Sequence, residues 1–194
     1  MYETNMYKSK CFTIGHSNNN FNTFLKLLSL YNIKAVADIR RIPYSSHVPH
    51  FSKKNFEKKL AENNIKYCYL GKYLGGFQEI PQNELQIGLK KFQQILNCAN
   101  RLTGEVTIMC SERDPSKCHR SSLISPLLIK EEITVYHILS SNKLISHQEL
   151  EQILIDKYIP NYNQISLLDS HPNYQNILTQ AYQKRRQDKS RLFS

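Results

Sequence analysis

The chain has 194 residues, of which 40% are hydrophobic and 22% charged, a composition typical of a globular domain and not of a wholly disordered chain. No apolar run approaches the roughly 20 residues that span a bilayer, and residues 1–10 lack the apolar core of a secretory signal. We therefore expect a cytoplasmic protein that has no membrane partner and whose five cysteines are reduced thiols.

The formal net charge of +10 favours a polyanionic partner, above all nucleic acid or a nucleotide. The alternative is that the basic residues only keep the protein soluble. The basic residues gather in two places, a predicted helix and the last eleven residues of the chain. They are Lys53, Lys54, Lys58 and Lys59 in the first, and Lys184, Arg185, Arg186, Lys189 and Arg191 in the second.

Short apolar runs alternate with stretches of helical periodicity as far as residue 158. In chain order, the sequence predicts strand 11–14, helix 21–28, strand 35–39, helix 53–63, strand 66–70, helix 84–100, strand 105–110, helix 121–132, strand 134–138 and helix 148–158. This alternation predicts an α/β fold of three layers, in which helices cover both faces of a mostly parallel sheet of about five strands.

Hydrophobic residues become sparse after Pro160, and polar and basic residues dominate. We therefore predict an α/β domain over residues 1–159 and a polar, basic C-terminal extension, partly disordered, over residues 160–194. The sequence contains no internal repeat.

Three of the predicted strands end in unusually polar loops. Ligands of open parallel sheets bind beyond the carboxyl ends of the strands, so these loops are candidates for one shared site. The loop residues are Gly15, His16 and Ser17 after the first strand; Asp38, Arg40, Arg41 and Ser45 after the second; and Cys110, Ser111, Glu112, Asp114, Cys118, His119 and Arg120 after the fourth.

These side chains supply the groups that acid–base and nucleophilic catalysis need. Candidates for proton transfer are His16, Asp38, Glu112 and His119. Cys118 is the candidate nucleophile, because it precedes a helix whose N-terminus, with His119 and Arg120 alongside, is expected to lower the thiol pKa. Arg40 and Arg120 are the candidate anion-binding residues.

Structural explanations for three of these residues remain open. His16 can serve only to hydrogen-bond its turn, Asp38 can form a stabilising ion pair with Arg40 or Arg41, and Cys110 can be an inert core thiol.

Metal and cofactor sites receive little support from the spacing of the motifs. Cys110, Cys118, His119 and His16 form a conceivable zinc set, but Cys-x7-Cys-His matches no common structural zinc pattern. The chain also has neither a P-loop nor a GxGxxG motif. We therefore predict no metal, no disulfide and no cofactor.

Five segments together resemble the bacterial domain-of-unknown-function family 488, over about residues 11–147. They are TIGHSN (13–18), VADIRRIPYS (36–45), YLGKYLGG (69–76), MCSERDPSKCHRSSLI (109–124) and VYHIL (135–139). The resemblance implies a cytosolic α/β fold with an active site at these motifs. By position, that site holds His16, Ser17, Asp38, Arg40, Ser45, Glu112, Cys118, His119 and Arg120, with Ser17 and Ser45 among the substrate-binding residues.

The leading functional hypothesis is an enzyme, a hydrolase or a transferase, that acts on an anionic, phosphate-bearing substrate such as a nucleotide or nucleic acid. The alternative is a non-catalytic nucleic-acid-binding protein, and a structural zinc protein is the weakest candidate. The acidic residues Asp38, Glu112 and Asp114 favour the enzyme, because a protein that only binds phosphates gains nothing from carboxylates beside its arginines.

Overall fold

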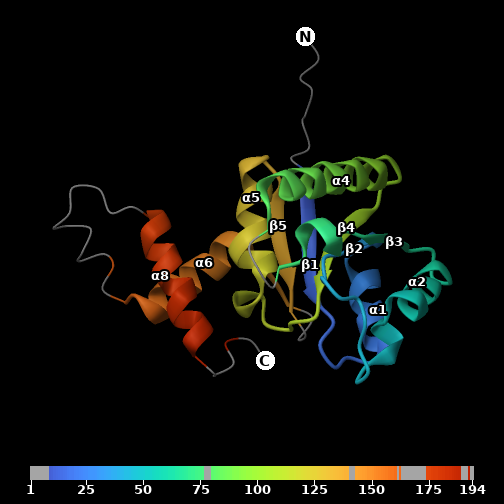
Figure 1. Cartoon of the computed structure of the whole chain (residues 1–194), viewed down its shortest axis with the longest axis horizontal. Coiled ribbons are helices and arrows are strands. Elements are labelled where there is room, and N and C mark those ends of the chain that lie inside the picture. The colour runs from blue at the N-terminus through green and yellow to red at the C-terminus, as the bar shows by residue number, and fades with distance from the viewer. Residues whose placement is uncertain are drawn as a thin grey trace, which may run out of the picture.

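The computed structural model describes residues 9–76, 80–139, 143–160, 162, 174–188 and 192. Its centre is a six-stranded sheet in the order β3-β2-β4-β1-β5-β6, of which Figure 1 labels β1 to β5. The strands are β1 (Lys10–Gly15), β2 (Ile33–Asp38), β3 (Lys66–Tyr69), β4 (Glu105–Cys110), β5 (Thr134–Ile138) and β6 (Leu144–Ser146). Strands β1 to β5 are parallel and β6 is antiparallel to β5, which confirms the predicted α/β fold with a mostly parallel sheet.

Helices lie on both faces of this sheet (Figure 1). The α-helices are α1 (Phe21–Leu30), α2 (Lys53–Ala61), α3 (Gly71–Leu74), α4 (Gln82–Arg101), α5 (Ser125–Lys130), α6 (His147–Tyr158) and α8 (Tyr174–Gln187). Short helical turns are η1 (Pro49–Phe51), η2 (Pro115–Lys117) and the π-helical η3 (Arg120–Ile124). One hydrophobic cluster joins α1 and α2 to the sheet, and another joins α3, α4 and α5 to the opposite face.

The central strands are buried on both faces because helices cover both faces and successive side chains of a strand point to opposite faces. In β4, Val106, Ile108 and Cys110 belong to the cluster under α4, whereas Met109 belongs to the cluster under α1. All four residues are at most 6% exposed. A strand covered on both sides reads as a continuous apolar run, which explains why residues 105–110 are recognisable in the sequence.

Several elements depart from the predicted set in the N-terminal 159 residues, and the short elements α3, η1 and η2 have no predicted counterpart. Strand β6 has three residues and was not predicted, and it continues the sheet beyond β5. The predicted helix at 121–132 is instead the π-helical turn η3, which is followed by α5. The other predicted elements are present, with ends that differ by a few residues.

A helix, α8, lies within the segment that we predict to be a polar extension. Its buried residues Ile177, Leu178, Ala181 and Tyr182 form a third hydrophobic cluster with α6. The division of the chain at residue 160 stays a prediction. None of the helices in the described ranges combines the length and apolar character that crossing a bilayer requires.

The five basic residues near the C-terminus do not act as one nucleic-acid-binding group, because Arg185 of α8 is buried. Its side chain is fully buried, and its Nη2 lies 2.5 Å from Oδ2 of Asp114. Arg185 is therefore a structural residue and is not available to nucleic acid. Lys184 and Arg186 of the same group are exposed, and Lys189 and Arg191 lie outside the described residues.

Candidate functional site

The polar loops after β1, β2 and β4 meet at one edge of the sheet, because these three strands are adjacent and parallel. Backbone hydrogen bonds continue the pairing beyond the strands: the amide of His16 donates to the carbonyl of Cys110, and that of Ser17 donates to Ser111. Gly15 allows this close approach, since a Cβ atom there would lie 1.8 Å from the carbonyl oxygen of Glu112. The Gly-His-Ser motif therefore owes its glycine to packing against the loop after β4.

A cavity of about 680 Å³ opens at this edge. Six of the sequence-predicted site residues line it: His16, Arg40, Ser45, Glu112, Cys118 and His119. The other three, Ser17, Asp38 and Arg120, do not line it. Arg41 and Cys110, which the sequence places in the candidate loops, also line the cavity, as do Tyr44, Lys117 and Arg186, to which the sequence assigned no role in the site.

Asp38 and Arg40 form a buried ion pair, of which only Arg40 lines the cavity. Nε of Arg40 donates to Oδ1 of Asp38 over 2.9 Å, and Nη2 donates to Oδ2 over 2.6 Å. The hydroxyl of Tyr67 also donates to Asp38, over 2.8 Å. Asp38 is 0% exposed. Its carboxylate therefore forms the ion pair that the sequence left as an alternative, and it cannot reach the proton of a substrate.

His16 is held in one tautomer by its neighbours. Because arginine only donates, Nη1 of Arg40 donates to Nε2 of His16 over 3.1 Å. Nδ1 of His16 then carries the proton and donates to the carbonyl of Ser17 over 2.8 Å. Burial, followed by the charge of Arg40, lowers the pKa of His16 to about 4. The ring is therefore neutral near pH 7, and it stacks on Phe51 with centroids 4.4 Å apart.

Ser17 and Ser45 shape the backbone of their loops. Ser17 has a φ of 45°, in the left-handed region, and its carbonyl accepts a hydrogen bond from Nδ1 of His16. Oγ of Ser45 accepts a hydrogen bond from the amide of Val48 over 3.1 Å, which closes a local turn. Ser45 lines the cavity, whereas Ser17 does not.

Arg120 anchors the loop that follows β4. Its side chain is fully buried, and its Nη1 and Nη2 donate to the carbonyls of Glu112 and Arg113. The guanidinium therefore holds the loop backbone in place. Arg120 does not line the cavity, so the prediction that it binds an anion there is wrong. Glu112 itself is exposed at the cavity, and its Oε1 accepts a hydrogen bond from the amide of Asp114 over 3.1 Å.

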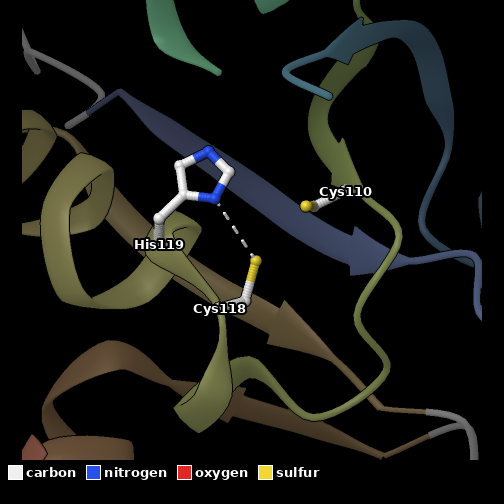
Figure 2. A group of neighbouring side chains, drawn as sticks. All are labelled: Cys110, Cys118 and His119. Atoms are coloured by element: carbon white, nitrogen blue, oxygen red, sulfur yellow. Dashed lines mark hydrogen bonds between the residues drawn. The ribbon is translucent and has the colours of Figure 1, made fainter. Parts of the chain in front are cut away.

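Cys110, Cys118 and His119 line the cavity and come together as one cluster (Figure 2). Their donor atoms all lie within 4.8 Å of one another, and Sγ of Cys118 is 3.9 Å from Nδ1 of His119. Nε2 of His119 is 3.0 Å from the carbonyl oxygen of Leu74. Figure 2 shows the two sulfur atoms and the imidazole ring directed toward a common point.

The two thiols differ in acidity, in the direction opposite to the one predicted. The hydrogen bond from the Cys118 thiol lowers the pKa of Cys110, and the charge of Arg120 contributes to the same effect. Burial raises the pKa of Cys118, as does its bond to Cys110. The prediction of a low thiol pKa at Cys118 is therefore wrong, because the side chain is only 4% exposed.

The family model described as "Domain of unknown function DUF488" matches residues 20–127, which is more than half of the chain. This match contains the site residues of β2 and of the loop after β4, while His16 and residues 135–139 lie outside it. No curated protein and no solved structure matches the chain. The chain thus belongs to the DUF488 family, the family that its motifs resemble.

Proposed function

We propose that the protein is an enzyme, a hydrolase or transferase, that acts on an anionic, phosphate-bearing substrate, a nucleotide or nucleic acid. The observation that carries the proposal is the charge of the cavity. Arg41, Lys117 and Arg186 line it from three different elements or loops, and Glu112 is the one carboxylate among its described lining residues. Arg40 adds no net charge, because Asp38 neutralises it.

The aromatic side chain at the cavity supports a nucleotide over a simple phosphate. Tyr44 is 71% exposed, and Ile42 beside it is 66% exposed, and both line the cavity. A nucleobase can stack on an exposed tyrosine, a contact worth about 1–3 kcal/mol per base. The cationic residues would then hold the phosphate while Tyr44 holds the base.

Glu112 is the residue that we propose for proton transfer. It is the exposed carboxylate of the cavity, whereas Asp38 is buried in its ion pair and the free ring nitrogen of His16 already accepts from Arg40. Acid–base catalysis requires a group within reach of the substrate proton, and the exposure of Glu112 at the cavity supports this role.

Lys117→Ala and Arg41→Ala are each expected to weaken binding of a nucleoside monophosphate about tenfold or more, because a hydrogen bond to a charged group contributes about 1.5–3 kcal/mol. Isothermal titration calorimetry measures the effect, with adenosine and uridine monophosphates and their nucleosides as ligands. Lys90→Ala, which removes an exposed lysine of α4 outside the cavity, is the matched control and should leave the affinity unchanged. Equal affinity of the protein for nucleosides and for their monophosphates would contradict the proposal.

Glu112→Gln is expected to abolish turnover while binding persists, because the amide keeps the size of the side chain but cannot exchange a proton. Nucleotides and oligonucleotides are incubated with the protein and the products are identified by mass spectrometry. A wild-type protein that binds oligonucleotides and leaves every substrate intact would support the non-catalytic alternative. Deletion of residues 183–194 is not a suitable test of that alternative, because it would also remove the buried Arg185.

A further inference from the structure

We propose that Cys110, Cys118 and His119 bind a divalent transition-metal ion of the zinc class, with the fourth coordination position open toward the cavity. All three residues line that cavity, and their donor atoms face one another (Figure 2). Catalytic zinc sites have this composition, with three protein ligands from cysteine and histidine and a fourth position for water or substrate.

The distances fit a tetrahedral ion with small side-chain adjustments. Zinc–sulfur and zinc–nitrogen bonds of about 2.3 and 2.0–2.1 Å imply edges of about 3.8 Å between two sulfurs and about 3.6 Å between sulfur and nitrogen. Sγ of Cys118 and Nδ1 of His119 are 3.9 Å apart, and no pair in the cluster exceeds 4.8 Å. Side-chain rotations that move the donor atoms by about 1 Å would bring them to the distances of a tetrahedral zinc site.

The orientation of His119 is a second and independent observation. A carbonyl oxygen only accepts, so the contact of 3.0 Å with Leu74 places the proton of the neutral ring on Nε2. Nδ1 then presents its lone pair to the two sulfurs. Histidines that ligate metals commonly donate the other ring N–H to a backbone carbonyl in this way, which fixes the tautomer and the ring orientation.

The chemistry of the donors selects the class of ion. Thiolate and imidazole ligands suit zinc and similar soft or borderline metals, whereas magnesium and calcium require oxygen ligands, and the cluster contains none among the described residues. A disulfide between Cys110 and Cys118 would use the two sulfurs but would give no role to the imidazole lone pair. The prediction of no metal rested on linear spacing, and the proposal departs from it because η2 brings Cys118 back beside Cys110.

The metal site stands without the proposed function, but the catalytic use of the ion rests on it. An ion bound there would polarise a phosphoryl oxygen or a water molecule that reaches the open position. The two ideas are separable, because metal binding and nucleotide binding are measured independently on one preparation.

The test is metal binding by the full-length, untagged protein, purified with a phosphine reductant and without chelators. Elemental analysis is expected to find stoichiometric zinc. After removal of the metal, titration with cobalt(II) should produce the absorption bands of a tetrahedral site together with thiolate-to-cobalt charge transfer. Zinc affinity, measured by competition with a chromophoric chelator, should fall in Cys110→Ser, Cys118→Ser and His119→Gln by more than the roughly 10–100-fold that loss of a supporting contact costs.

Cys98→Ser is the matched control, because Cys98 is an exposed thiol of α4 outside the cluster, and this variant should bind metal like the wild type. Circular dichroism establishes that each variant is folded, and His119→Gln keeps the test valid should a cysteine variant unfold. A reduced wild-type protein that binds no zinc and shows no thiolate-to-cobalt charge transfer would overturn the proposal. A metal-free protein isolated with a Cys110–Cys118 disulfide would overturn it as well. If that metal-free protein still binds nucleotides in the calorimeter, the proposed function survives the loss of the metal site.

Discussion

Replacing Asp38 with asparagine is expected to lower the free energy of unfolding by about 3–5 kcal/mol, because it leaves the Arg40 guanidinium as an uncompensated buried charge. The two side chains are 0% and 5% exposed, and Nη2 of Arg40 lies 2.6 Å from Oδ2 of Asp38. The hydroxyl of Tyr67, which now donates to the charged carboxylate of Asp38, would then face a neutral amide. Urea denaturation followed by circular dichroism measures the loss.

Glu62→Gln is the matched control, since it makes the same chemical change at an exposed carboxylate just beyond α2 and should alter stability by no more than about 0.5 kcal/mol. The double variant Asp38→Asn, Arg40→Gln completes a mutant cycle. Its loss of stability should be smaller than the sum of the two single losses, because the residues interact directly. A single Asp38→Asn loss no larger than that of the control would show that the ion pair does not stabilise the fold.

The sheet, and the edge of it that carries the candidate site, are predictable from local sequence patterns. Strands buried on both faces must be apolar throughout, so residues 105–110 are evident in the sequence. Parallel strands need helical crossovers, which place the loops after β1, β2 and β4 at one edge. Strand β6 escaped prediction because three residues are too few to display a period of two.

Helix α8 was predictable in part. Ile177, Leu178, Ala181 and Tyr182 recur at helical spacing and are buried, but the polar residues around them conceal this pattern in the average composition. Sequence alone does not identify the partner of α8. The contact of Arg185 with Asp114 joins residues 71 positions apart, and no local rule connects them.

The contacts within the candidate site likewise depend on tertiary structure, which local sequence patterns do not predict. The sequence indicates an ion pair of Asp38 with Arg40 or Arg41 as one alternative, and only the structure selects Arg40. The pairing of Cys110 with Cys118 depends on the path of the loop between them, and therefore on Arg120, which holds the carbonyls of Glu112 and Arg113. Residue types alone favoured Cys118 as the thiolate. In the structure, the hydrogen bond between the two thiols lowers the pKa of Cys110, whereas burial and this bond raise that of Cys118.

Replacing Arg185 with methionine is expected to cost about 3–5 kcal/mol of unfolding free energy, because it strands the Asp114 carboxylate in a buried position. Nε of Arg185 also donates to Oγ of Ser116 over 2.7 Å, so the change removes a connection between α8 and η2 at two points. Methionine preserves much of the side-chain length and keeps apolar packing. The expected loss therefore reports the charge and its hydrogen bonds.

Arg186→Met is the control, since it removes the same charge from the adjacent, exposed position of α8 and should change stability by no more than about 0.5 kcal/mol. Hydrogen exchange locates the effect: amides of residues 174–187 should lose protection in Arg185→Met, and those of β4 should lose less. Because Asp114 lies between Glu112 and Cys118 in the loop after β4, the same variant should also disturb the position of these two cavity residues. Equal stability of Arg185→Met and Arg186→Met would mean that α8 is held by its apolar contacts with α6 alone.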